Sequence, residues 1–167
     1  DAGADVLYGE AGDDLLYTGS GPGDELFGGS GNDMLTGGDD VDTLHGDAGK
    51  DLLLGGGGAD QLYGGGDDDR IIGQGGNDLI DGNAGADVLI GGDGSDTIRG
   101  HGTIGPDDNA VDTLIGDNGE DDTSAGAAGD TLYGNGGNDF IYGEGGDDMI
   151  AGDNDLADIS GAGDGDD

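Results

Sequence analysis

Aspartates recur at nine-residue intervals along most of the chain. Between Asp24 and Asp96 each follows the previous one by nine residues, and sixteen of seventeen successive units carry the aspartate. Carboxylate oxygens are ligands for hard divalent cations, and this carboxylate is offered many times, whereas a catalytic centre is singular. We therefore expect repeated cation binding. The aspartates in this phase are Asp5, Asp14, Asp24, Asp33, Asp42, Asp51, Asp60, Asp69, Asp78, Asp87, Asp96, Asp112, Asp121, Asp130, Asp139 and Asp148.

A large aliphatic residue stands two positions after nearly every aspartate. The unit is G-G-x-G-x-D-x-U-x, where U is the aliphatic residue, and "GGSGNDMLT" at 28–36 is one complete copy. Thr123 replaces the aliphatic residue in one unit, which we expect to weaken its coil. The other members of the series are Leu7, Leu16, Leu26, Leu35, Leu44, Leu53, Leu62, Ile71, Ile80, Leu89, Ile98, Leu114, Leu132, Ile141, Ile150 and Ile159.

Each unit predicts a tight turn followed by a short strand. Glycine allows the positive φ angles and close backbone approach that such a turn needs. In the segment x-U-x the middle side chain points inward and its neighbours outward, because side chains alternate along a strand. Two units make one 18-residue coil with strands on opposite walls, and stacked coils pair in parallel about 4.8 Å apart. We therefore expect an all-β fold, a right-handed parallel β-roll roughly 40 Å long.

Stacking places the aspartates in two columns at the edges of the roll. Unpaired carboxylates about 5 Å apart would repel, so we expect a cation between successive turns. A flexible all-oxygen site favours Ca²⁺ over the smaller Mg²⁺. About fourteen such ions would bring the formal charge of −37 to about −9. One column holds Asp24, Asp42, Asp60, Asp78 and Asp96, and the other holds Asp33, Asp51, Asp69 and Asp87.

The nonapeptide resembles the calcium-binding repeat of the RTX (repeats-in-toxin) family, and the resemblance covers essentially the whole chain. It implies that each calcium ion lies between two turns of one edge, held by aspartates and backbone carbonyls. It also implies export by a type I secretion system, with the array unfolded in the cytosol and folded outside the cell. We expect a calcium-binding structural and folding module of a secreted bacterial protein. Two alternatives stay open: a segment of an adhesin, surface layer or self-associating fibre, and an accessory module of a secreted protease, lipase or polysaccharide epimerase.

Composition limits the remaining functions. The 167 residues include 45 glycines and no cysteine, so a conventional core, a disulfide framework and a thiolate metal site are not expected. The negative charge disfavours nucleic acid, and no apolar run reaches membrane-span length. His45 and His101 are the only histidines, and no nucleophile and base pairing is suggested, so we do not expect an enzyme.

Several segments depart from the repeat. Asp40 and Asp67 replace the third glycine of their turns, either as additional ligands or as tolerated substitutions. Residues 100–112 carry seven extra residues, which we expect to form a loop at one edge or a recognition loop. We expect sites joining Asp87 to Asp112 and Asp112 to Asp130 across this region. The pattern decays over 152–167, and we expect one array over 1–167 that is a fragment of a longer chain.

The outward strand positions differ between the two walls. Assigning alternate repeats to the walls gives one wall on which most outward residues are apolar, and we expect another copy of the roll or a neighbouring domain to contact it. The other wall carries Glu25, Thr43, His45, Gln61, Asp81, Arg99 and Asp122 among others. The apolar wall is predicted to present Leu15, Tyr17, Met34, Thr36, Leu52, Leu54, Arg70, Ile72, Val88, Ile90, Thr113, Ile115, Thr131, Tyr133, Met149 and Ala151.

Overall fold

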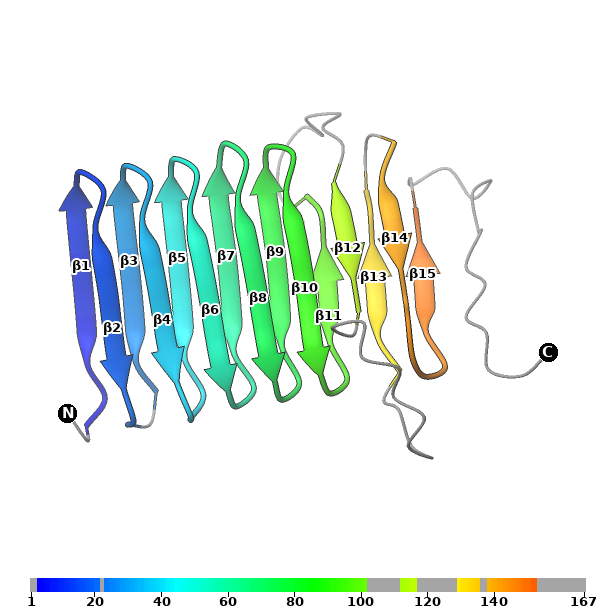
Figure 1. Ribbon diagram of the computed structural model, residues 1–167, viewed down its shortest axis with the longest axis horizontal. Helices are drawn as coiled ribbons and strands as arrows, with labels where there is room; N and C mark the ends of the chain where they lie inside the picture. Colours follow the sequence, from blue (N-terminus) through cyan, green and yellow to red (C-terminus); the bar gives the residue numbers. More distant parts are fainter. Residues whose placement is uncertain (1–2, 22, 102–111, 117–128, 136–137, 153–167) are drawn as a thin grey trace.

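Two parallel sheets face each other and form the two walls of a roll (Figure 1). The computed structural model describes residues 3–21, 23–101, 112–116, 129–135 and 138–152. Within these ranges there are fifteen strands and no helix. Successive strands run in opposite directions along opposite walls, and β1 and β15 lie at opposite ends of the stack. The predicted all-β parallel β-roll is confirmed.

The odd wall is the sheet of odd-numbered strands, paired in the order of the chain. Its register joins residues 18 apart over its central part, for example Leu44 with Leu62. The strands are β1 (Val6–Ala11), β3 (Glu25–Ser30), β5 (Thr43–Ala48), β7 (Gln61–Gly66), β9 (Leu79–Ala84), β11 (Thr97–Arg99), β13 (Thr131–Tyr133) and β15 (Met149–Ala151).

The even wall is the sheet of even-numbered strands, and over its central part it has the same offset of 18, for example Leu53 with Ile71. The strands are β2 (Leu15–Gly19), β4 (Met34–Gly38), β6 (Leu52–Gly57), β8 (Arg70–Gly75), β10 (Val88–Asp93), β12 (Thr113–Ile115) and β14 (Phe140–Tyr142).

The core is a single file of aliphatic side chains from each wall. From Leu26 to Leu132 these side chains have no exposed surface, while Leu7, Ile141 and Ile150 at the ends are partly buried. One aliphatic residue per strand is a thin core for a chain with this much glycine. The fold therefore needs a further source of stability at the turns.

The strands of the first ten repeats are longer than the three residues predicted. In β3 the strand continues to Ser30, because Gly29 and Ser30 pair with Asp47 and Ala48 of the next coil before the chain turns. Consequently Gly28 is an inward position, two residues after Leu26. The first glycine of the repeat lines the interior and is not part of the turn.

The assignment of repeats to walls is wrong after Ile115. Strand β11 pairs directly with β13, and β12 pairs directly with β14, so the repeat that contains Asp121 and Thr123 adds no rung between them. Its residues lie outside the described part of the chain, as does Ile159. The two walls are exchanged from that point: β13 and β15, with Tyr133 and Met149, belong to the odd wall, and β14 belongs to the even wall.

Candidate metal sites

The aspartates form one column at each edge of the roll. The Asp60 edge is the set of turns leading from even to odd strands, and the Asp69 edge is the set leading from odd to even strands. Their central members are buried, with Asp60 0% and Asp69 3% exposed. The Asp60 edge contains Asp5, Asp24, Asp42, Asp60, Asp78, Asp96, Asp130 and Asp148, and the Asp69 edge contains Asp14, Asp33, Asp51, Asp69, Asp87, Asp112 and Asp139.

One carboxylate oxygen of each aspartate ties adjacent coils together. The backbone N–H of Asp42 donates to Oδ1 of Asp60 at 2.8 Å, and that of Asp60 donates to Oδ1 of Asp78 at 2.9 Å. The same bond recurs down both columns. An aspartate at this position therefore fixes the register of the turns as well as contributing a charge.

The second carboxylate oxygen, Oδ2, is buried and unpaired over most of both columns. In a buried position an anionic oxygen without a hydrogen bond is costly, and each one needs an explanation. Among the described residues, Oδ2 has no hydrogen-bond partner in Asp14, Asp24, Asp33, Asp42, Asp51, Asp60, Asp69, Asp78 and Asp148.

The first glycine of each repeat makes room for this oxygen. A Cβ atom built on Gly46 would lie 2.5 Å from Oδ2 of Asp51 and 2.6 Å from the carbonyl oxygen of Gly64 in the next coil. On the other edge, a Cβ on Gly37 would lie 2.6 Å from both Oδ2 of Asp42 and the carbonyl oxygen of Gly55. An alanine would not fit at these positions. Two oxygens from adjacent coils thus converge on the space that each glycine leaves open.

Burial makes the ionised carboxylates unfavourable without a counter-charge. Desolvation raises the pKa of Asp60 to about 7, and the Asp78 and Asp42 carboxylates add to the rise against the opposing hydrogen bond from the Asp42 backbone. Desolvation likewise raises the pKa of Asp69 to about 8 and that of Asp51 to about 6. It also raises the pKa of Asp42 and Asp78. A cation between the turns would reverse this effect.

The donor set fits a hard cation with mixed ligands. Within the described part of the chain, no three His, Asp or Glu side chains come together as a ligand cluster. Two carboxylates border each gap, and a backbone carbonyl oxygen of the next coil, such as that of Gly64, approaches the same space. All of these donors are oxygens, which suits Ca²⁺ and allows its flexible geometry. Calcium binding by the aspartates that recur at nine-residue intervals stays a prediction.

The described turns form seven gaps on the Asp60 edge and six on the Asp69 edge. The backbone of Asp87 donates to Asp112 at 2.9 Å across the insertion, so the expected pairing of these two turns is present. The expected site joining Asp112 to Asp130 is wrong. Asp112 pairs with Asp139, whereas Asp130 lies on the opposite edge between Asp96 and Asp148. Asp121 lies outside the described residues.

Asp40 and Asp67, which replace the third glycine of their turns, lie on the outer surface of the two edges. Asp67 adopts a φ of 74° and is exposed, as is Asp40, and both add to the negative potential around the buried columns. The role of Asp40 and Asp67, either as additional ligands or as tolerated substitutions, stays a prediction. Lys50 pairs with Asp68 of the next coil on the outside of the Asp69 edge.

A ring ladder on the odd wall is not among the sequence predictions. Tyr8, Phe27, His45 and Tyr63 stack with ring centroids 4.8–5.0 Å apart and nearly parallel planes. Asp81 and Arg99 continue the column, with Nη1 of Arg99 3.4 Å from Oδ1 of Asp81. The sequence does contain a pattern that predicts this ladder, because these residues stand one position after the core aliphatic residue in successive coils of the odd wall. His45 is outward, as expected, and belongs to this ladder.

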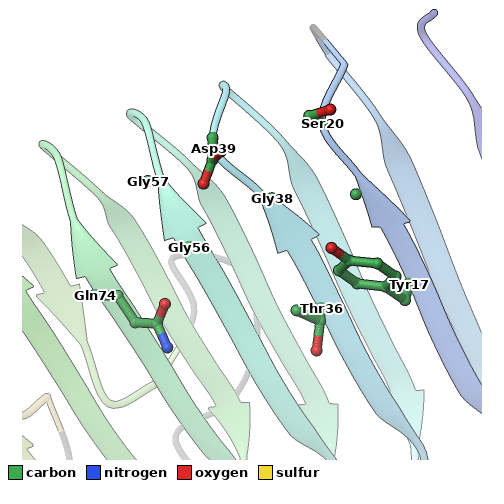
Figure 2. A pocket seen from close by; sticks show the side chains of 9 residues that line it. Tyr17, Ser20, Thr36, Gly38, Asp39, Gly56, Gly57 and Gln74 are labelled. Carbon is green, nitrogen blue, oxygen red and sulfur yellow. The ribbon is translucent and has the colours of Figure 1, made fainter. Parts of the chain in front are cut away.

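The even wall is apolar over most of its length. Leu15 and Tyr17 are 74% and 66% exposed near one end, and Phe140 and Tyr142 are 57% and 50% exposed near the other. Figure 2 shows Tyr17 and Thr36 on neighbouring strands of this wall, beside a shallow hollow that Gly38, Gly56 and Gly57 leave open. The hollow brings together no acid and base pair, so we assign it no chemistry.

Comparison with known protein families identifies the repeat. A family model described as the RTX calcium-binding nonapeptide repeat, four copies long, matches residues 1–22, 23–53, 45–80, 72–102 and 124–155. No curated protein and no solved structure matches the chain. No helix long and apolar enough to cross a membrane occurs among the described residues.

Proposed function

The chain belongs to the family of RTX calcium-binding nonapeptide repeats, and from this premise we propose that calcium binding and folding are a single event in it. The repeats make it a calcium-binding module of a secreted bacterial protein. In the proposed function the chain is unfolded without calcium and forms the β-roll when ions occupy the gaps between turns. The module is structural and has no catalytic activity of its own.

The buried carboxylate columns are the observation that carries this proposal. Oδ2 of Asp60 is buried without a hydrogen-bond partner among the described residues, and its pKa is raised to about 7. One pKa unit corresponds to about 1.4 kcal/mol, so each such carboxylate held ionised at neutral pH costs a few kcal/mol. Such costs at Asp51, Asp60 and Asp69 together are comparable with the roughly 5–15 kcal/mol by which domains are stable. A cation in each gap removes this cost and supplies stability that the thin core lacks.

Calcium concentration would then set where the module folds. RTX repeat proteins are typically secreted by bacteria. Extracellular calcium modules bind at about 10⁻⁴ to 10⁻³ M, well above the free calcium of cytosol. We propose that the chain crosses the cell envelope unfolded through a type I secretion system and folds outside.

The even wall supports a further part of the proposal, contact with a second copy of the roll. Its apolar strip runs over seven strands, and its end residues are largely exposed. A second copy presents the same spacing of strands, so side chains of two such strips can interdigitate along their whole length. Calcium would favour this contact because it lowers the net charge of both copies.

Calcium titration followed by far-ultraviolet circular dichroism tests the proposed function. In calcium-free buffer at neutral pH we expect a disordered spectrum, and we expect a cooperative change to β structure as calcium is added. Magnesium at equal concentrations is the control and should give little β structure, because it requires a smaller, more rigid site. A chain that is already folded without calcium contradicts the proposal.

A further inference from the structure

Thr18 occupies a position that is glycine in every other repeat of the described part of the chain. It lies two residues after the core residue Leu16, the position held by Gly37 and Gly55 in the next coils of the same edge. The side chain is 6% exposed and therefore points into the roll. The turn that follows is one residue longer than the others, since Leu26 comes ten residues after Leu16.

The glycine at this position leaves a specific space open in the other coils. A Cβ on Gly55 would lie 2.6 Å from Oδ2 of Asp60 and 2.8 Å from the carbonyl oxygen of Gly73. Both distances are too short for a carbon–oxygen contact, so only a glycine lets these two oxygens come together here. The two oxygens that a cation would use, one from each coil, therefore converge beside the glycine. A side chain there competes with a cation for the same space.

Thr18 places its side chain in that space and bonds to the oxygen of the next coil. Its hydroxyl Oγ1 donates to the carbonyl oxygen of Gly37 at 3.1 Å, in a buried hydrogen bond between residues 19 apart. A carbonyl oxygen has two lone pairs, so one remains for such a bond when a ladder N–H uses the other. In the gap between the turns of Asp24 and Asp42, a hydroxyl thus links the two coils.

We propose that Thr18 takes the place of a calcium ion in the gap between the turn of Asp24 and the turn of Asp42. This gap binds no calcium, whereas the gaps from Gly37 onward on the same edge do. Asp24 still serves the gap on its other side, where its Oδ1 accepts from the backbone N–H of Asp5 at 2.7 Å. The proposal rests on the calcium binding proposed above and adds a residue that sets how many ions the Asp60 edge takes.

The carboxylate of Asp24 is the basis for predicting how replacement of Thr18 affects ion binding. Its Oδ2 is buried and has no hydrogen-bond partner among the described residues. The gap therefore retains a carboxylate that could bind an ion, and it lacks only the space that the Thr18 side chain fills. Thr18→Gly should create a site, and Thr18→Val, which keeps the shape but not the hydroxyl, should create none.

Native mass spectrometry in calcium, with isothermal titration calorimetry, tests the proposal by counting ions. We expect Thr18→Gly to bind one ion more than the parent chain. We expect Thr18→Val to bind the same number as the parent, with lower thermal stability from the lost hydrogen bond. Thr18→Ser, which keeps the hydroxyl, is the matched control and should match the parent in both measurements.

Two results would overturn the proposal. If Thr18→Val binds one ion fewer, the hydroxyl is a calcium ligand and not a replacement for the ion. If Thr18→Gly folds in calcium and binds the same number of ions as the parent, the side chain does not exclude an ion. A parent chain that binds no calcium at all would instead contradict the proposed function, so the two failures are distinguishable.

Discussion

Asp60 shows how a single carboxylate can serve two coils. Its Oδ1 accepts the backbone N–H of Asp42, while its Oδ2 faces the carbonyl oxygen of Gly73 across the space beside Gly55. The position and phase of this aspartate could be predicted from the sequence, because the nine-residue spacing repeats through the chain. The different roles of the two oxygens could not, since they depend on the side-chain rotamer and on the inward direction of the first glycine.

Replacing Asp60 by Asn should have opposite effects with and without calcium. Asn keeps an Oδ1 acceptor for Asp42 but removes the charge, so about two neighbouring gaps should bind calcium less tightly. The calcium affinity of these gaps should fall roughly tenfold, since a contact with a charged group contributes about 1.5 to 3 kcal/mol, and the calcium midpoint of folding should rise by a smaller factor because the other gaps still bind. In calcium-free buffer the variant should be less destabilised than the parent, because no buried charge remains at residue 60.

The matched control for this substitution is Asp39→Asn, at an exposed acid on the rim of the same edge. Calcium titrations of parent, variant and control by circular dichroism give the midpoints, and the β content of the three proteins in calcium-free buffer at about pH 5 to 8 gives the second effect. An unchanged midpoint for Asp60→Asn would show that the buried aspartates are not the ligands.

The two walls share one backbone pattern but carry different outer faces. The odd wall stacks Tyr8, Phe27, His45 and Tyr63 into a ladder, which supports the pairing of its first four strands. The even wall carries separate apolar side chains. Membership of each wall could be predicted up to Ile115 by counting repeats. Beyond it the count fails, because spacing alone cannot show that one repeat adds no rung.

Charges placed on the even wall should prevent association of the roll. Leu54 and Ile90 point outward from β6 and β10, and replacing both by Asp introduces repulsion on a strip that would otherwise be covered. In saturating calcium we expect the parent chain to scatter light as a dimer or larger species and the double variant to scatter as a monomer.

Thr43→Asp with Gln61→Asp adds the same charge to the odd wall and is the control for the even-wall variant. We expect it to associate as the parent does. A monomeric parent, or equal association of all three proteins, would rule out contact through the even wall.

The whole molecule combines a formal charge of −37 with carboxylates whose pKa values are raised by burial. The raised values mean that the folded chain binds more protons than the unfolded chain between about pH 4 and pH 8. The stability of the calcium-free roll is therefore present at low pH and is lost as pH rises through the folded pKa values, about 6 for Asp51, 7 for Asp60 and 8 for Asp69. Protons and calcium should thus compete for the same oxygens.

Acidification should therefore replace part of the effect of calcium. In calcium-free buffer we expect more β structure by circular dichroism at about pH 5 than at about pH 8. At the lower pH a higher calcium concentration should be needed to complete folding, because binding must displace protons. A calcium-free chain that gains β structure as pH rises would contradict the assignment of the buried aspartates as the destabilising groups.

Small-angle X-ray scattering with and without calcium tests the coupling of binding to folding most directly, because it measures the size of the whole chain. For 167 residues, an unfolded chain has a radius of gyration of about 43 Å and a compact domain about 15 Å. At neutral pH we predict a value near the unfolded one in calcium-free buffer, falling close to the compact one in millimolar calcium but not in millimolar magnesium. A chain that is compact in calcium-free buffer, or that magnesium compacts equally well, would contradict calcium-coupled folding.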